Sequence, residues 1–300
     1  MVQGLNFLLR WYVQLKSKPI LEAREISFSY ADGTQALDKI SLSIPRGKKT
    51  AFLGPNGAGK TTLFLHFNGI LKPNRGKVCY DGREVRYNHT SLLNLRKNVG
   101  IVFQDPETQL FSSSVWQEIS FGPVNLGLPK EKVWERVNQA MAEAGITDLR
   151  DKPTHFLSYG QKKRVAIADI LAMKPKVLIC DEPTAWLDVK CAAQTMELFD
   201  LINHTTGVTI IFSTHDVDLA YSWADYIFLI KNGKIIAEGI PEHIFYNQRL
   251  LAEAELDRPW LVDIYEELKR KGWVASNVPP STKQELLEQI REKNVMVTND

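Results

Sequence analysis

The sequence predicts an α/β fold with a parallel sheet, an antiparallel β edge, a helical insert and a small helical extension at the C-terminal end. Two compact β-branched runs, at residues 177–180 and 208–213, are typical of strands buried in a parallel sheet. A glycine-rich loop stands between an apolar run and a helical pattern within residues 49–70. From about residue 105 to residue 172 the apolar spacing becomes helical. These observations favour an α/β domain that is interrupted by helices.

The elements follow one another in a regular order. Strands are expected at residues 21–30, 36–44, 49–53, 78–80, 99–103, 177–180, 208–213, 224–230 and 234–238, where apolar or alternating runs end at turn-forming residues. Helices are expected from the glycine-rich loop to residue 70, and at residues 115–121, 130–144 and 161–173. Past Gly239-Ile240-Pro241 the chain becomes helical and charged, and a polar tail follows Pro280. We expect an N-terminal extension at residues 1–20, a main domain at 21–240 with its helical subdomain at about 105–172, and a C-terminal extension at 241–300.

Composition and charge exclude several classes of protein. The chain has 300 residues, 44% of them hydrophobic and 24% charged, as is typical of a globular protein. A net charge of +2 is too small to indicate a nucleic-acid partner, and none is expected. No run reaches the roughly 18 apolar residues of a membrane span. The apolar start at residues 1–15 is interrupted by Arg10, and we expect a helix packed on its own domain or an amphipathic arm rather than a signal peptide. The three scattered cysteines are expected to be buried free thiols.

The glycine-rich loop has the pattern of a phosphate-binding P-loop. It reads Gly54-Pro55-Asn56-Gly57-Ala58-Gly59-Lys60-Thr61-Thr62 and lies between an apolar strand and a helix. The glycines let the backbone curl so that successive N–H groups point at phosphate oxygens, and the positive end of the helix adds to them. Lys60 is expected to contact the β- and γ-phosphates, and the Thr61 hydroxyl to ligate Mg²⁺. The loop therefore predicts a nucleoside triphosphate bound with Mg²⁺.

Two adjacent acids follow the apolar run at residues 177–180. Asp181, at the strand end, is expected to hold Mg²⁺ directly or through water. Glu182 faces the other side of the chain and is positioned to polarise an attacking water. The alternative is an ordinary helix N-terminus, but the P-loop upstream favours the catalytic interpretation. A P-loop alone does not distinguish among kinases, GTPases and ATPases. The two adjacent acids are a second site that narrows these classes of enzyme.

Together with four further motifs in a fixed order, these residues resemble the ATP-binding-cassette family. Leu157-Ser158-Tyr159-Gly160-Gln161 is similar to its signature motif, which opens a helix. The resemblance implies that Ser158, Gly160 and Gln161 contact the ATP held by the opposite subunit. Tyr159 stands where the family usually has glycine, and Trp186 stands where it usually has a small residue.

The remaining motifs of the resemblance lie at single positions. Gln104 matches the Q-loop glutamine, which approaches Mg²⁺ and the attacking water, and His215 matches the switch histidine, which contacts the γ-phosphate. Asp188 matches the D-loop, which crosses the dimer interface, and Tyr30 matches the aromatic residue that stacks on adenine. The resemblance implies an ATPase that works as a head-to-tail dimer. Each ATP would lie between the P-loop of one chain and the signature of the other.

Further stretches resemble one group within that family. Residues 103–111 and 121–129 are similar to the ATPase subunits of energy-coupling-factor transporters, and residues 67–73 and 158–168 are most similar to the cobalt-type branch. The resemblance implies a subunit at the cytoplasmic face of the cell membrane that hydrolyses MgATP for an importer of cobalt or nickel. Its implied partners are a second copy or a paralogous ATPase, a transmembrane coupling protein and a substrate-binding membrane subunit. The C-terminal extension would then help to hold the dimer. From the acidic and aromatic character of residues 105–111, directly after Gln104, we expect a groove that receives a coupling helix of the membrane partner; the alternative is an ordinary packed loop.

Three other functions remain alternatives. The same kind of ATPase can serve a vitamin importer, because this subunit does not contact the substrate. A soluble ATP-binding-cassette protein that remodels nucleic acid or ribosomes usually carries two cassettes or a long coiled-coil insertion, whereas this chain has one cassette and nearly balanced charge. A nucleotide-dependent kinase needs an acceptor pocket and has no reason to carry a signature motif. The motifs favour the transporter subunit.

Overall fold

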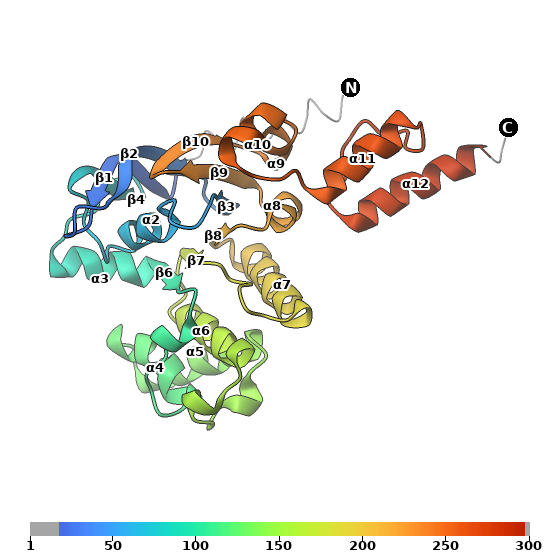
Figure 1. Cartoon of the computed structure of the whole chain (residues 1–300). Coiled ribbons are helices and arrows are strands. Elements are labelled where there is room, and N and C mark those ends of the chain that lie inside the picture. Colours follow the sequence, from blue (N-terminus) through green and yellow to red (C-terminus); the bar gives the residue numbers. More distant parts are fainter. Residues whose placement is uncertain (1–17, 298–300) are drawn as a thin grey trace.

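The computed structural model describes residues 18–297, and its centre is a six-stranded sheet (Figure 1). The strands lie in the order β10-β9-β3-β8-β7-β6. Their bounds are β3 (Lys49–Leu53), β6 (Val99–Val102), β7 (Val177–Cys180), β8 (Thr209–Thr214), β9 (Tyr226–Lys231) and β10 (Lys234–Gly239). All neighbours pair in parallel except β10, which runs antiparallel along the edge. The predicted parallel sheet and its antiparallel edge are confirmed.

A second, antiparallel sheet packs beside the first. Its strands lie in the order β2-β1-β4-β5, with bounds β1 (Leu21–Ser29), β2 (Gln35–Ile44), β4 (Arg75–Tyr80) and β5 (Arg83–Glu84). Helices α2 (Lys60–Phe67) and α3 (His89–Asn98) follow β3 and β5. One apolar core joins this sheet and α2 to one face of the central sheet, and it includes Phe52 of β3. Ala51 and Leu53 belong instead to the core on the opposite face, because successive strand residues point to opposite sides.

The remaining helices of the main body lie on the opposite face of the central sheet and in a cluster beside it. They are α4 (Val115–Asn125), α5 (Lys130–Glu143), α6 (Tyr159–Ala172), α7 (Val189–Thr206) and α8 (Val217–Trp223), with short 3-10 helices at Pro106–Thr108, Thr147–Leu149 and Thr154–Phe156. Figure 1 shows α4, α5 and α6 gathered at the end of the molecule beside β6. The C-terminal end of α6 packs so closely on β6 that a Cβ at Gly100 would lie 2.1 Å from the side chain of Ile170. Helix α6 is therefore fixed to the central sheet at one end and belongs to the helical cluster at the other.

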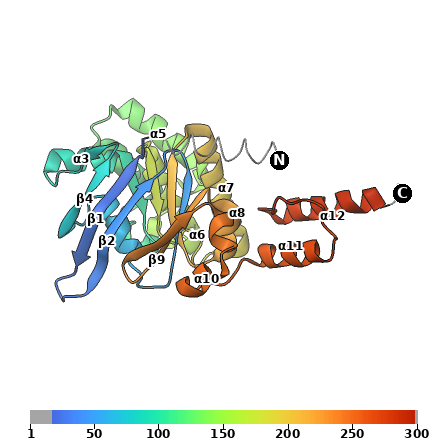
Figure 2. The ribbon, with the colours of Figure 1, turned by 90° about the horizontal axis from the view of Figure 1, so that it is seen from above.

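The C-terminal part is helical, as its sequence predicts. Its helices are α9 (Pro241–Phe245), α10 (Gln248–Ala254), α11 (Trp260–Arg270) and α12 (Lys283–Val297). Figure 2 shows α11 and α12 projecting from the main body beyond α8. The pair is tied to α8, since the Tyr221 hydroxyl donates to the carbonyl of Pro280 at 3.0 Å and the Trp260 N–H donates to Asp218 at 2.9 Å. Within residues 18–297, no helix combines the length and the apolar character that a membrane span requires.

Several predicted details are corrected. The first helix after the P-loop ends at Phe67 instead of residue 70, because Gly69 takes a left-handed φ of +73° and Asn68 donates its side chain to the carbonyl of Val99. The helix expected at residues 115–121 continues through Pro123 to residue 125, and Pro123 is buried. Cys191 is only half-buried, whereas the other two free cysteines are buried. The N-terminal arm considered for residues 1–15 lies outside the described residues.

Candidate nucleotide site

The P-loop curls tightly between β3 and α2. Gly54 has a φ of +155°, and a Cβ there would lie 2.0 Å from the carbonyl oxygen of Ile230. Gly59 has a φ of +104°, and a Cβ there would lie 2.6 Å from the carbonyl oxygen of Ala36. These backbone contacts leave no room for a side chain, and the left-handed conformation at Gly59 favours glycine in its own right. The two glycines therefore set the shape of the loop from which α2 begins.

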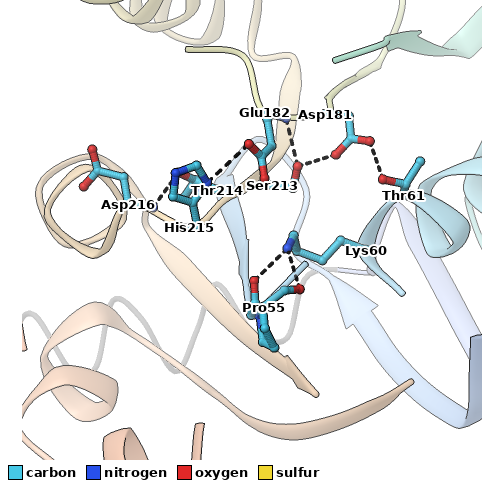
Figure 3. A network of polar contacts seen from close by, with 10 residues as sticks. Pro55, Lys60, Thr61, Asp181, Glu182, Ser213, Thr214, His215 and Asp216 are labelled. Atoms are coloured by element: carbon cyan, nitrogen blue, oxygen red, sulfur yellow. Dashed lines mark hydrogen bonds and ion pairs between the residues drawn. The ribbon is translucent and has the colours of Figure 1, made fainter. Parts of the chain in front are cut away.

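Lys60 is buried at the start of α2, with its side chain folded back into the P-loop (Figure 3). Its ammonium donates to the carbonyl of Gly54 at 2.7 Å and to that of Pro55 at 3.1 Å. Burial lowers the pKa of Lys60, and the charges of Glu182 and Asp181 partly oppose that shift. Among the described residues, no carboxylate forms a salt bridge with this ammonium. A cation held by neutral carbonyls inside a glycine loop is suited to bind a phosphate group.

A chain of oxygen contacts joins the P-loop helix to the ends of two central strands. The Thr61 hydroxyl donates to one oxygen of Asp181 at 2.5 Å. The Ser213 hydroxyl donates to the other oxygen of Asp181 and accepts the N–H of Glu182 at 2.9 Å. Asp181 is buried, although Thr61 is exposed. Because β7 and β8 are parallel neighbours, their carboxyl ends bring Asp181 and Ser213 to the same edge of the sheet.

Thr61 and Asp181 can hold a magnesium ion only if phosphate oxygens supply further ligands. Mg²⁺ prefers hard oxygen ligands and is usually held by one or two carboxylates together with substrate phosphates. The hydroxyl of Thr61 and the carboxylate of Asp181 are already in contact and provide such a partial set. In the part of the chain that the structure describes, no group of three or more His, Cys, Asp or Glu side chains forms a complete site. The donor set is therefore typical of a site that a nucleotide completes.

Glu182 and His215 lie side by side at the edge of this cluster. The Nδ1 atom of His215 is 3.3 Å from a carboxylate oxygen of Glu182. Glu182 has a left-handed φ of +44°, and its N–H is held by Ser213. The His215 side chain is 70% exposed, whereas that of Glu182 is only 11% exposed. A nearly buried carboxylate beside an exposed imidazole can accept a proton from a water molecule that approaches the open side of the pair.

The structure gathers only part of the predicted site within one chain. The Tyr30 hydroxyl is 2.9 Å from the Thr62 hydroxyl, so Tyr30 adjoins the P-loop helix. Gln104 follows β6, and its side chain has no hydrogen bond to other described residues, although its carbonyl has two donors. The N–H of Ser158 donates to the Gln161 side chain at 3.0 Å at the start of α6.

The signature and D-loop residues stand apart from the P-loop. Ser158 and Gln161 form a reciprocal capping box at the N-terminal end of α6. A Cβ on Gly160 would lie 3.3 Å from the Cys191 sulfur. Asp188 caps α7 by accepting the N–H of Cys191 at 2.9 Å. Their contacts are with one another and with α7, so these residues do not complete the Lys60 cluster in the described chain.

Two residues with well-defined contacts at this site are absent from the sequence-based predictions. Ser213 joins Asp181 to the backbone of Glu182, and Lys163 donates to the carbonyls of Phe103 and Gln104. One feature of the sequence could have indicated Ser213: it is a polar side chain near the end of a largely apolar strand. Lys163 lies in an amphipathic helix, where a lysine is usually exposed, and nothing in its spacing indicates that it is buried.

A partly buried carboxylate that contacts the loop after Gln104 makes stability depend on pH. Asp169 of α6 hydrogen bonds Gln109, and burial, with the charge of Glu118, raises the pKa of Asp169 to about 7. The folded state therefore keeps a proton that the unfolded state releases near pH 4, and stability falls as pH rises from about 4 to about 7, by at most about 1.4 kcal/mol per pH unit. We expect Asp169→Asn to remove this slope in urea unfolding at about pH 5 and about pH 7. The exposed Asp151→Asn should keep it, and an equal slope in both variants would contradict the assignment.

Comparisons with known proteins agree with this fold. A family model described as ABC transporter matches residues 37–185. An energy-coupling factor transporter ATP-binding protein of Clostridium perfringens is 46% identical over 252 residues, which are 84% of this chain and 88% of that relative. A putative ABC transporter ATP-binding protein of Methanosarcina mazei is 46% identical over 277 residues. The match covers 92% of this chain but only 61% of the longer Methanosarcina protein.

Solved structures show the same similarity. CbiO1 of Clostridium perfringens, described as part of the ABC transporter complex CbiONQ, is 45% identical with a TM-score of 0.72, over 84% of this chain and 100% of that one. An ATP-binding cassette captured as a dimer after hydrolysis, with ADP and Pi, is 26% identical with a TM-score of 0.67, over 74% of this chain and 98% of that one. Fold and site together define a P-loop ATPase of the ATP-binding-cassette type. Within that class, the chain belongs to the ABC transporter family, in its group of energy-coupling factor transporter ATP-binding proteins.

Proposed function

We propose that the chain is the MgATP-hydrolysing subunit of an energy-coupling-factor importer, with cobalt or nickel as the imported ion. The observation that carries the proposal is the division of the site. Lys60, Asp181 and Glu182 converge in one cluster, whereas the signature residues at the start of α6 face elsewhere. Such a chain needs a second cassette to surround its nucleotide, and the structurally similar cassette with ADP and Pi is a dimer. The choice of metal rests on the similarity to CbiO1.

Each residue of the cluster has a proposed role in ATP hydrolysis. Lys60 and the P-loop N–H groups bind the phosphates, and Thr61 and Asp181 hold Mg²⁺, which supplies charge neutralisation on the β- and γ-phosphates. Glu182 accepts the proton of the attacking water, and His215 beside it contacts the γ-phosphate. Gln104 would meet both Mg²⁺ and the water, and its side chain is uncommitted within the described chain. Tyr30 stacks on adenine from its half-exposed position beside α2.

The opposite face of each ATP would come from the other cassette of the dimer. Ser158, Gly160 and Gln161 would present the N-terminal end of α6, whose orphan N–H groups and positive dipole favour a phosphate. Asp188 would lie at the same interface. The second cassette is a copy of this chain or a paralogous ATPase. The extension at residues 241–300 would add a dimer contact, and α11 and α12 project from the body as such a contact requires (Figure 2).

The membrane partner is proposed to dock beside the loop that follows Gln104. Phe111 is 66% exposed and Phe121 is 50% exposed, and their rings meet edge to face at 4.9 Å. Glu107, on the same loop, forms a salt bridge at 2.5 Å with Lys162 of α6. Exposed paired aromatics are typical of a binding surface. We propose that a coupling helix of the transmembrane protein lies on them, which would hold the chain at the cytoplasmic face of the membrane.

Variants of this surface should weaken membrane-complex formation. We expect Phe111→Ala to lower retention of the membrane partner by at least about 10-fold. The partner would bury the Phe111 ring, and truncating an aromatic anchor at an interface costs about 2 kcal/mol or more. Glu107→Lys should act in the same direction, because it also repels Lys162. Retention is measured by pull-down of the tagged chain from detergent-solubilised membranes. Trp134→Ala, at a side chain 57% exposed on α5, is the matched control. Normal retention and transport in both Phe111→Ala and Glu107→Lys would remove this surface from the proposal.

One experiment tests the whole proposal. The tagged chain is purified from native membranes in mild detergent, and the integral membrane proteins retained with it are identified. A coupling protein with a cobalt- or nickel-binding membrane subunit is the expected result. A vitamin-binding subunit would keep the mechanism and overturn the metal. If no membrane partner is retained under conditions that preserve ATP-dependent dimers, the transport function is wrong and a soluble remodelling ATPase is favoured.

A further inference from the structure

Two aromatic residues stand where related cassettes usually have small ones, and the structure brings them together. The rings of Tyr159 and Trp186 meet edge to face, with centroids 5.6 Å apart. Tyr159 opens α6, and Trp186 lies in the loop between Glu182 and α7. Trp186 has a left-handed φ of +61°, which is strained for a bulky residue, yet its side chain is 69% exposed. A strained and mostly exposed tryptophan is not explained by core packing.

Tyr159 also reaches the loop that carries Gln104. Its hydroxyl donates to the Gln104 carbonyl at 3.0 Å. One turn further along α6, the buried Lys163 donates to the same carbonyl at 2.9 Å and to the carbonyl of Phe103 at 3.0 Å. Burial, together with the charges of Asp105 and Glu107, raises the pKa of Tyr159 to about 12, so the hydroxyl keeps its proton at neutral pH. Two donors from α6 therefore hold one backbone carbonyl.

The other side of the same helix turn faces α7. A Cβ on Gly160 would lie 3.3 Å from the Cys191 sulfur and 3.8 Å from the Leu187 side chain. The Arg164 guanidinium hydrogen bonds the side chain of Gln194. The first turns of α6 thus lie between the loop after β6 and the segment after Glu182. Both neighbouring segments lead directly to residues of the chain's own nucleotide cluster.

We propose that Tyr159 is a positioning residue that links the two nucleotide sites of the dimer, acting on the Gln104 loop and on Trp186. The inference rests on the proposed function. In that dimer, Gln104 and Glu182 serve the ATP on their own chain, whereas Ser158 and Gly160 serve the ATP on the other. Tyr159 contacts the Gln104 carbonyl and Trp186 directly, and it lies between Ser158 and Gly160 in the chain. A shift of Gln104 toward its own nucleotide would therefore also shift the signature turn at the second nucleotide. Such a link is a coupling free energy between sites.

The hydroxyl of Tyr159 can be tested separately from its ring. Tyr159→Phe keeps the contact with Trp186 and removes only the donation to Gln104. A steady-state ATPase titration of the full chain then gives kcat, KM and the Hill coefficient. We expect the Hill coefficient to fall toward unity and kcat to fall by about 2- to 10-fold, as for the loss of one hydrogen bond. The affinity of the dilute monomer for ADP should stay within about 2-fold, because Tyr159 does not line that half of the site.

A tyrosine-to-phenylalanine change elsewhere in the chain is the control, because it removes the same hydroxyl group at a position outside the proposed link. Tyr87 packs against the apolar core of the antiparallel sheet, and its hydroxyl has no hydrogen-bond partner among the described residues. Tyr87→Phe should leave the Hill coefficient and kcat unchanged. A second variant, Trp186→Gly, relieves the left-handed backbone and removes the ring. It should lower the Hill coefficient as well. The Hill coefficient of the double variant should be no lower than that of the more severe single variant, because both substitutions act through Tyr159.

The outcomes separate this inference from the proposed function. A cooperative, active wild type with an equally cooperative Tyr159→Phe variant would overturn the link, as would an active wild type with a Hill coefficient of unity. A loss of kcat that only follows a lower Tm would make Tyr159 a packing residue and overturn it too. A wild-type chain that hydrolyses no ATP, either alone or in the complex purified from native membranes, would contradict the proposed function instead. If Tyr159→Phe does not fold, unchanged cooperativity in Trp186→Gly overturns the link.

Discussion

Glu182→Gln is expected to lower the turnover number for ATP by at least about 100-fold while nucleotide affinity is retained. The amide has nearly the shape of the carboxylate, but it cannot accept the proton of the attacking water. The backbone N–H of residue 182 would still be held by Ser213, so the local structure should persist. Steady-state phosphate release measures turnover, and fluorescence titration measures affinity. We also expect ATP to trap the closed dimer, which size-exclusion chromatography detects.

A surface variant provides the control for this prediction. Glu131→Gln changes an exposed carboxylate on α5 and should hydrolyse ATP at the wild-type rate. Unchanged hydrolysis in Glu182→Gln would remove Glu182 as the catalytic base. A fall in turnover together with a proportionate fall in ATP affinity would indicate that Glu182 shapes the site rather than accepts a proton, because a base is needed only in the reaction itself.

Lys60→Ala is expected to weaken ATP binding itself, by about 10- to 100-fold in Kd, since hydrogen bonds to charged groups contribute about 1.5–3 kcal/mol each. The Lys60 ammonium is held inside the P-loop by the carbonyls of Gly54 and Pro55, where it can turn toward an arriving phosphate. Equilibrium titration with a fluorescent ATP analogue gives the affinity. A Tm measurement on the same sample separates lost binding from lost folding, because the variant also leaves two loop carbonyls without their donor.

The control for the lysine variant is Lys130→Ala, at an exposed position at the start of α5. It removes the same charge from the chain and should bind ATP as the wild type does. Undiminished affinity in Lys60→Ala would contradict the assigned phosphate contact. The glutamate and lysine variants are expected to differ in kind, since Glu182→Gln should stop turnover with ATP bound, whereas Lys60→Ala should prevent ATP from binding.

Local patterns in the sequence predict much of the fold and the residues that we propose to bind the nucleotide within one chain. The P-loop could be predicted because its glycine spacing, followed by Lys60 and Thr61, is a local pattern between an apolar run and a helical pattern. The backbone atoms that exclude a side chain at Gly54 and Gly59 come from distant Ile230 and Ala36, and only the folded chain shows them. Asp181 and Glu182 could be predicted because a buried strand must end where its apolar run ends. The parallel sheet followed from compact β-branched runs alternating with helical patterns. In each of these, the pattern that supports the prediction lies in neighbouring residues of the sequence.

Contacts between side chains that are far apart in the sequence depend on how the chain folds. Ser213 reaches Asp181 because β7 and β8 pair in parallel with one particular register, and no periodicity in either strand records that partner. Tyr159 reaches both Gln104 and Trp186 because α6 packs between two loops that are far from it in sequence. The sequence alone identified Tyr159 and Trp186 as unusual, but their pairing depends on side-chain packing in three dimensions. Packing is non-local, and for that reason the contacts on which the proposed link rests are found only in the folded chain.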